Sequence, residues 1–117
     1  MKINEVTGAG YLVHELHGRL DAGSADIVKQ KLLTTLQQAS QHLVIDCAGL
    51  QYISSIGLRV LLVATKQAST QHVRLVLCNL TEMVRQVFDL AGFGKVIPHY
   101  ASRAEAVAAL ATFARQA

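Results

Sequence analysis

The sequence predicts an α/β fold in which a mixed β-sheet opens with a hairpin, continues with parallel strands and packs against about four helices. Three observations lead to this prediction. Two strand-like runs separated by glycines open the chain, apolar runs then alternate with amphipathic runs, and helix-capping signals precede the later amphipathic runs. The chain has 117 residues, of which 51% are hydrophobic and 16% charged, so we expect a single globular domain over residues 1–117.

The first elements are a hairpin and a long amphipathic helix. Residues 2–6 (KINEV) and 11–16 (YLVHEL) alternate in polarity on either side of two glycines, a pattern typical of two antiparallel strands and their turn. In residues 18–39, apolar side chains recur at the four-residue spacing of a helix face. Asp21 or Ser24 is expected to accept hydrogen bonds from the first free amides of this helix.

Strands and helices alternate over the rest of the chain, which predicts parallel strands joined by crossover helices. Two of the strand-like runs are uninterrupted and apolar, as in strands covered on both faces, while Pro98 places the third at an edge. These three runs are residues 42–47 (HLVIDC), 73–79 (VRLVLCN) and 95–100 (KVIPHY). The helical runs are the strongly apolar residues 56–64, then residues 81–92 and residues 103–116.

Capping signals and apolar spacing locate the later helices and the core. Asn79 with Glu82, and Ser102 with Glu105, have the spacing of capping boxes at the start of the last two helices. Gly92 stands where a helix ending at the preceding residue would need a left-handed residue. The side chains expected inside the molecule include Leu61, Leu62, Val84 and Phe88.

Several function classes receive no support from the sequence. The net charge is +3, but lysines and arginines are scattered rather than gathered into a basic patch for nucleic acid. No apolar run reaches the length of a membrane helix, and the start of the chain lacks the pattern of a secretory leader, so we expect a cytoplasmic protein without a membrane partner. Cys47 and Cys78 close apolar runs and are expected to be buried, reduced thiols.

Neither a cofactor nor a catalytic centre is expected. No phosphate-binding glycine motif occurs, and neither the histidines nor the cysteines have the spacing of metal ligands. Each histidine is interpreted as structural or solvated, which leaves no evident base for a serine nucleophile and argues against an enzyme. The five histidines are His14, His17, His42, His72 and His99.

The stretch LQYISSIGLRVLL, residues 50–62, is unusual for the start of an apolar helix. One of the two adjacent serines, Ser54 and Ser55, can cap the helix, but the other is then unexplained. Gly57 in the first turn costs about 1 kcal/mol relative to alanine, and the cation of Arg59 opposes the helix dipole. An anion such as a phosphoserine, held by the free amides with Arg59 as counter-charge, would account for these features. Gly57 would then leave the backbone open to a partner.

Three segments give the chain a resemblance to a known family. GRLDAGSA, LVIDCAGLQYISSIGLRVLL and MVRQVFDLAGFGKVI follow one another in the order and spacing of the landmarks of STAS domains. Among these domains, the chain is similar to the bacterial anti-sigma factor antagonists. The resemblance implies a sheet backed by helices and a role as a protein-binding switch.

The resemblance also implies a phosphorylation site and a set of partner-binding residues. The phosphorylated serine falls on Ser55, and Asp46 matches an acidic or amide position of the family. The chain departs from the family at two places, because many members carry an aspartate at the position of Ser54 and a small residue at the position of Ile56. The predicted partner-binding residues are Asp21, Ser54, Ser55, Ile56, Gly57 and Arg59.

The partners implied by the resemblance are an anti-sigma factor that is also a serine kinase, and a serine phosphatase that reverses its action. Binding is expected when Ser55 is unmodified and release when it is phosphorylated. One alternative is a STAS accessory module of a transporter or a larger signalling complex, in which Ser55 only caps the helix. A small serine hydrolase is a further alternative, for which the general base is missing. The sequence makes no prediction of the oligomeric state.

Overall fold

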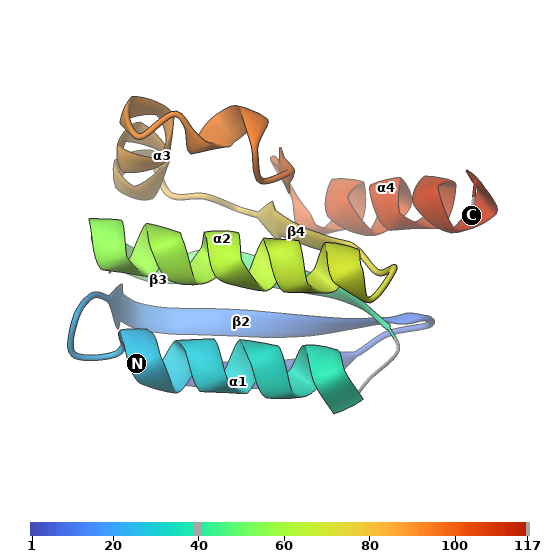
Figure 1. Ribbon diagram of the computed structural model, residues 1–117. Helices are drawn as coiled ribbons and strands as arrows, with labels where there is room; N and C mark the ends of the chain where they lie inside the picture. Colours follow the sequence, from blue (N-terminus) through green and yellow to red (C-terminus); the bar gives the residue numbers. More distant parts are fainter. Residues whose placement is uncertain (39–40, 117) are drawn as a thin grey trace.

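The computed structural model describes residues 1–38 and 41–116 and contains one β-sheet with helices on both faces (Figure 1). Its strands are β1 (Lys2–Thr7), β2 (Tyr11–Leu20), β3 (His42–Ile53), β4 (Leu75–Cys78) and β5 (His99–Tyr100). Its helices are α1 (Ala25–Gln38), α2 (Ser55–Thr70), α3 (Glu82–Leu90) and α4 (Arg103–Gln116), with a short 3₁₀ helix η1 (Phe93–Lys95).

The sheet confirms the predicted mixed topology. Its strand order follows the chain, β1-β2-β3-β4-β5. β1 pairs with β2 antiparallel as the opening hairpin, and each later strand pairs parallel with the one before it. Because the parallel strands run the same way, the loops that follow β2 and β3 leave the sheet at the same edge.

Helices cover the two faces unequally. α1, α2 and α3 contribute to the main apolar core on one face, and Figure 1 shows α1 and α2 side by side across β2 and β3. α4 covers the other face with a smaller cluster, in which Ala106 and Leu110 pack with Val13 of β2, Val44 of β3, and Val76 and Cys78 of β4. The strands are therefore covered on both faces where they meet α4, as their uninterrupted apolar runs predicted.

The predicted core residues lie inside the molecule. Leu61, Val84 and Phe88 are almost fully buried, while Leu62 is partly exposed and packs against the main core. Cys47 and Cys78 are buried free thiols, as predicted. Burial raises the pKa of Cys78 to about 12, so this thiol stays protonated at neutral pH.

Two helix termini agree with the predicted signals. At the start of α4, the Ser102 hydroxyl accepts a hydrogen bond from the Glu105 amide (3.1 Å), and the Glu105 carboxylate accepts one from the Ala101 amide (3.1 Å). Gly92 adopts φ = +76° directly after the C-cap of α3. A left-handed glycine at this point ends the helix, as the sequence indicates.

Other element boundaries differ from the prediction. The capping box at Asn79 is wrong, because Asn79 has φ = +56° and the N-cap of α3 is Thr81, whose side chain accepts from the Val84 amide. β3 extends to Ile53 because it continues to pair with β2 beyond the end of β4. The last strand is reduced to His99–Tyr100, since η1 includes Lys95 and residues 96–98 form no strand, but β5 lies at an edge as predicted.

Within the described residues, no helix is long and apolar enough to cross a membrane.

Candidate functional site

The carboxyl ends of β2 and β3 and the first turn of α2 form the candidate site. Leu20 and Ile53 are register partners at the ends of the two strands, and the Ser54 amide donates to the Leu20 carbonyl at 3.0 Å. The structure therefore places Asp21, which follows Leu20, at the same edge of the sheet as Ser54. In Figure 1 this edge coincides with the start of α2.

Ser54 and Ser55 have different positions at the helix start. Ser54 is the N-cap residue, in extended conformation (φ −96°, ψ 174°), and its hydroxyl accepts from the Gly57 amide at 3.3 Å. Ser55 is the first helical residue and is exposed. Because the first amides of a helix have no partner within it, the Ser55 side chain lies beside unused donors and the positive end of the helix dipole.

Gly57 has a structural explanation that the sequence did not reveal. The residue is buried, and a Cβ atom here would lie 2.6 Å from the Leu20 carbonyl oxygen and 2.9 Å from Cγ1 of Ile53. The interpretation that Gly57 leaves the backbone open to a partner is therefore wrong. The glycine instead lets the first turn of α2 approach the end of β2.

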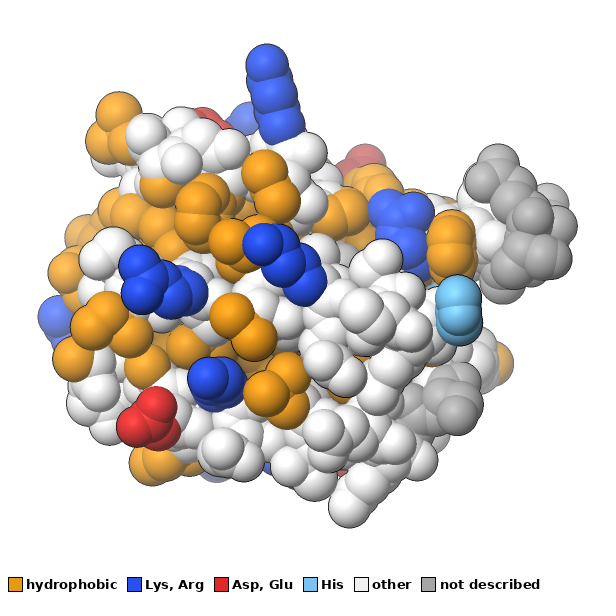
Figure 2. All heavy atoms as spheres, in the orientation of Figure 1, with side chains coloured by type: hydrophobic (Ala, Val, Ile, Leu, Met, Phe, Trp, Pro, Cys, Tyr) orange, Lys and Arg blue, Asp and Glu red, His pale blue; other side chains and the backbone are white. Residues whose placement is uncertain are grey.

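The exposed face of α2 continues from Ser55 with apolar and basic residues. Ile56 is 48% exposed and Val63 36% exposed, and Arg59 is exposed between them. These positions are three and four residues apart, so their side chains share one face of the helix. In the part of the chain that the structure describes, no carboxylate lies within ion-pair distance of Arg59. Figure 2 shows hydrophobic side chains interspersed with lysines and arginines on the side that carries α1 and α2.

Asp21 holds its own loop together and does not cap α1. Its Oδ1 accepts from the Gly23 amide (3.0 Å) and its Oδ2 from Nε of Arg19 (3.4 Å). Ser24 donates its hydroxyl to the Arg19 carbonyl (2.7 Å) and accepts from the Asp21 amide (3.1 Å). The prediction that either side chain accepts from an amide of α1 is therefore wrong, since both bonds remain in the preceding turn.

The same edge contains a residue pair that the sequence analysis missed. The Arg19 guanidinium lies 4.2 Å from the centre of the Tyr52 ring. The two residues are register partners on β2 and β3, so they meet only once the strands are aligned. The contact was not predicted because the two residues are far apart in sequence. The one available signal was a basic residue and an aromatic residue, each just before a polar loop, which could form a cation–π contact.

Comparison with known proteins establishes the family. The model of the STAS domain family matches residues 1–106. The chain belongs to the STAS domain family. The resemblance inferred from the sequence segments is thereby confirmed.

Two relatives match most of this STAS domain. BtrV of Bordetella bronchiseptica, named as a candidate anti-sigma factor antagonist, is 37% identical over 103 residues, which cover 88% of this chain and 89% of BtrV. The anti-sigma F factor antagonist of Paenibacillus polymyxa is 28% identical over 102 residues, which cover 86% of this chain and 87% of that protein.

Solved structures share the fold at low sequence identity. A candidate anti-sigma factor antagonist of Thermotoga maritima has a TM-score of 0.86 at 16% identity, covering 92% of this chain and 93% of its own. Unphosphorylated SpoIIAA has a TM-score of 0.76 at 22% identity (91% and 93% covered), and phosphorylated Bacillus SpoIIAA one of 0.68 at 21% (91% and 96%). A sulfate transporter family protein of Wolinella succinogenes has a TM-score of 0.79 at 15% (94% and 92%).

Asp46, which the resemblance singled out, lies in an ion-pair network inside this STAS domain. Its Oδ2 accepts from Arg103 at 2.8 and 3.1 Å, its Oδ1 accepts from Asn79 at 3.2 Å, and Arg103 also pairs with Glu15. Burial by itself would raise the pKa of Asp46, but hydrogen bonds from the Ala48 amide, Arg103 and Asn79 outweigh it and hold this pKa below its usual value. Asp46 therefore stays ionised and ties α4 to the sheet.

Among the described residues, no group of three or more histidine, cysteine or acidic side chains is placed to hold a metal ion.

Proposed function

We propose that this STAS domain is an anti-sigma factor antagonist that binds an anti-sigma factor through the surface around Ser55. The names of BtrV and of the Paenibacillus polymyxa relative support the antagonist class, because both align with nearly the whole domain. The observation that carries the proposal is the exposed Ser55 at the first position of α2, beside a helix face that combines Ile56, Arg59 and Val63.

The proposed switch is phosphorylation of Ser55 by a partner that is both anti-sigma factor and serine kinase, and removal of the phosphate by a serine phosphatase. Ser54 supplies the cap, so the Ser55 hydroxyl is free to react without loss of the helix start. A phosphoserine carries a charge of about −1.5 to −2 at pH 7. Arg59 stands one helical turn further along α2 and can pair with this charge.

Release follows from the surroundings of the phosphate rather than from a change of fold. Ile56 and Val63 would lie against the partner when Ser55 is unmodified. A dianion at the border of this apolar contact must be desolvated on binding, and it repels acidic groups of the partner. The free amides and Arg59 meanwhile stabilise the phosphorylated form in isolation. Both effects favour the dissociated state.

A comparison of two variants tests the proposal. Tagged wild-type protein should capture from the native lysate an anti-sigma factor with ATP-dependent serine kinase activity. Ser55→Ala should retain this partner, and Ser55→Asp should lose it. Incubation of the purified pair with ATP, followed by mass spectrometry, should place one phosphate on Ser55. Phosphate on Ser54, or on neither serine, would contradict the proposed switch.

A role as an accessory module of a transporter or a larger signalling complex is the second candidate. It is favoured only by the fold shared with the Wolinella succinogenes protein. In that case Ser55→Asp should leave the captured partner unchanged, and no kinase should accompany the domain.

A further inference from the structure

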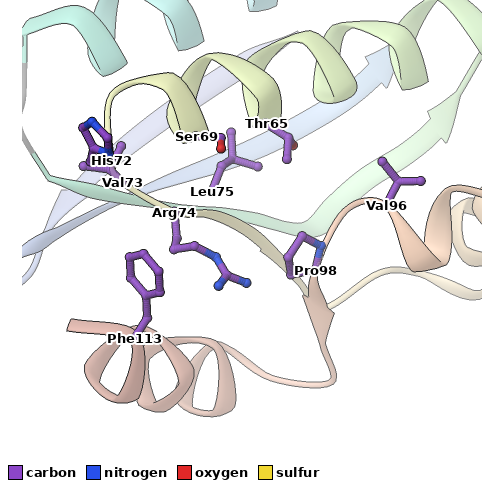
Figure 3. Close-up of a pocket in the computed structure, with 9 residues that line it drawn as sticks. All are labelled: Thr65, Ser69, His72, Val73, Arg74, Leu75, Val96, Pro98 and Phe113. Carbon is purple, nitrogen blue, oxygen red and sulfur yellow. The ribbon is translucent and has the colours of Figure 1, made fainter. Parts of the chain in front are cut away.

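A hollow at the other end of α2 combines an arginine with apolar side chains. Its volume is about 550 Å³, within the range of small-molecule sites. It lies between the last turns of α2, the start of β4, the segment before β5, and α4 (Figure 3). The lining residues are Thr65, Ser69, His72, Val73, Arg74, Leu75, Val96, Pro98 and Phe113.

Arg74 is the charged group of this hollow. Its guanidinium lies 4.9 Å from the centre of the Phe113 ring, and Figure 3 shows both side chains in the space between β4 and α4. His42 contacts both residues, since its Nδ1 accepts from the Arg74 backbone amide (3.0 Å) and its ring stands edge-on to that of Phe113, with 5.4 Å between the ring centres. The guanidinium lies within cation–π distance of the Phe113 ring and keeps its hydrogen-bond donors.

No acidic side chain among the described residues compensates this charge. The lining includes no aspartate or glutamate, and Arg74 forms no ion pair with any described residue. Burial and, to a lesser degree, the charge of Arg74 lower the pKa of His42, so His42 is neutral at pH 7. An anion in the hollow would therefore be attracted by Arg74 rather than by His42. The Ser69 hydroxyl adds a polar group on the α2 side, whereas the Thr65 hydroxyl already donates to the Leu61 carbonyl at 2.8 Å.

Apolar side chains form much of the remaining wall. Val73, Val96 and Pro98 offer hydrocarbon surface and Phe113 offers an aromatic ring, while Leu75 is only 2% exposed and contributes little. A guanidinium binds a carboxylate through two parallel hydrogen bonds, while an aromatic ring is stabilised by burial against apolar and aromatic side chains. A ligand with both a carboxylate and an aromatic ring would therefore meet a cation and apolar side chains in the same hollow.

We infer that this hollow binds a small aromatic carboxylate, with Arg74 holding the carboxylate and the apolar wall holding the ring. The inference is independent of the proposed function. Ser69 stands fourteen positions after Ser55 on α2, so the hollow lies about 20 Å from the phosphorylation site at the helix rise per residue. The two sites can therefore be tested separately.

The test uses 2-naphthoate as the probe, 2-naphthamide as its uncharged isostere, and isothermal titration calorimetry as the measurement. Wild-type protein should bind 2-naphthoate with 1:1 saturation and bind the amide at least about tenfold more weakly, since the charge-assisted pair is lost. In NMR titrations the amide signals of residues 69–75 should shift, and those of residues 54–59 should not.

Three variants complete the test. Arg74→Gln should weaken 2-naphthoate binding by about tenfold or more. Arg74→Lys should bind with intermediate affinity, because lysine keeps the positive charge but cannot form two parallel hydrogen bonds to the carboxylate. Arg85→Gln, which removes an arginine on the surface of α3, should bind as the wild type does. Absence of saturable binding at millimolar probe, equal affinity for the amide, or unchanged affinity in Arg74→Gln would each overturn the inference. If Arg74→Gln does not fold, the comparison of acid and amide on the wild type decides.

Discussion

At the scale of single residues, three neighbouring residues at the start of α2 have different roles, which the sequence alone does not distinguish. Ser54 caps the helix, Ser55 is exposed at its first position, and Gly57 is buried against the end of β2. Only Ser55 is free of a role in holding the helix start. This separation makes the structural and the functional contributions of the two serines measurable in isolated protein.

The two serines should differ in their effect on stability. Ser54→Ala removes the acceptor of the Gly57 amide and should lower the free energy of unfolding by about 1 kcal/mol. Ser55→Ala, the matched control, should change it by less than about 0.5 kcal/mol, as at other exposed positions. Urea denaturation followed by circular dichroism measures both. A larger loss in Ser55→Ala than in Ser54→Ala would show that Ser55 is the cap.

Gly57→Ala should destabilise the protein even though alanine is the better helix former. The new methyl group would overlap the Leu20 carbonyl oxygen at 2.6 Å, and backbone on both sides must move to admit it. We expect a loss of about 1–3 kcal/mol in urea denaturation, as in overpacked cores. If Gly57→Ala instead stabilised the protein by roughly 1 kcal/mol, the gain expected from helix propensity alone, the first turn of α2 would be able to move without a cost in free energy.

At the scale of elements, the attachment of α4 depends on the Asp46 network as much as on apolar contact. Among the described side chains of α4, Ala106 and Leu110 are buried in the cluster with the sheet and Val107 packs against it, whereas Arg103 in the first turn bonds to Asp46 on β3 and Glu15 on β2. Asp46 is 6% exposed and Arg103 partly exposed, so the pair is shielded on one side only. The network fixes the direction in which α4 leaves the sheet.

The Asp46 network should make stability depend on pH in the acid range. The pKa of Asp46 is lower in the folded protein than in the unfolded chain, so the folded state resists protonation. The resulting stabilisation is complete above the unfolded pKa, near 4, and is lost as the pH falls through the lower folded pKa. Asp46→Asn should lose about 1–3 kcal/mol at pH 7, because Arg103 remains half-solvated after the loss of its partner.

Urea denaturation at several pH values between 7 and 2 measures this effect. The wild type should lose more stability than Asp46→Asn over the acid part of this range. Asp26→Asn, a change of an exposed carboxylate in the first turn of α1, is the control and should follow the wild-type profile. Parallel profiles for wild type and Asp46→Asn would contradict the role assigned to the network.

At the scale of the whole molecule, stability resides mainly in the core between the sheet and the α1–α2–α3 face. Leu61 lies at the centre of α2 with 1% exposure, while Leu90 at the end of α3 is 90% exposed. Leu61→Ala should lower the free energy of unfolding by about 2–5 kcal/mol, the usual effect of removing a buried leucine. Leu90→Ala should change it by less than about 0.5 kcal/mol. Similar effects of the two changes in urea denaturation would contradict the assigned core.

The sequence by itself determined the mixed sheet, its edge strand, the core stripe of the helices and the end of α3 at Gly92. These features depend on local periodicity and on backbone preferences of single residues, which act wherever the residue stands. Local capping rules predicted the cap of α4 but not that of α3. The Asn79 side chain donates to Asp46 on the neighbouring strand β3, and its backbone adopts a left-handed conformation. Thr81 is therefore the N-cap of α3 instead.

Only the tertiary structure decided why α2 has a glycine, Gly57, in its first turn, which groups Asp46 binds, and where Arg74 lies relative to Phe113. Each of these contacts joins residues that are distant in sequence, namely Gly57 to Leu20, Asp46 to Arg103 and Arg74 to Phe113. Residue type and spacing carry no record of such pairings, because they arise only when strand register and helix placement bring the side chains within contact distance.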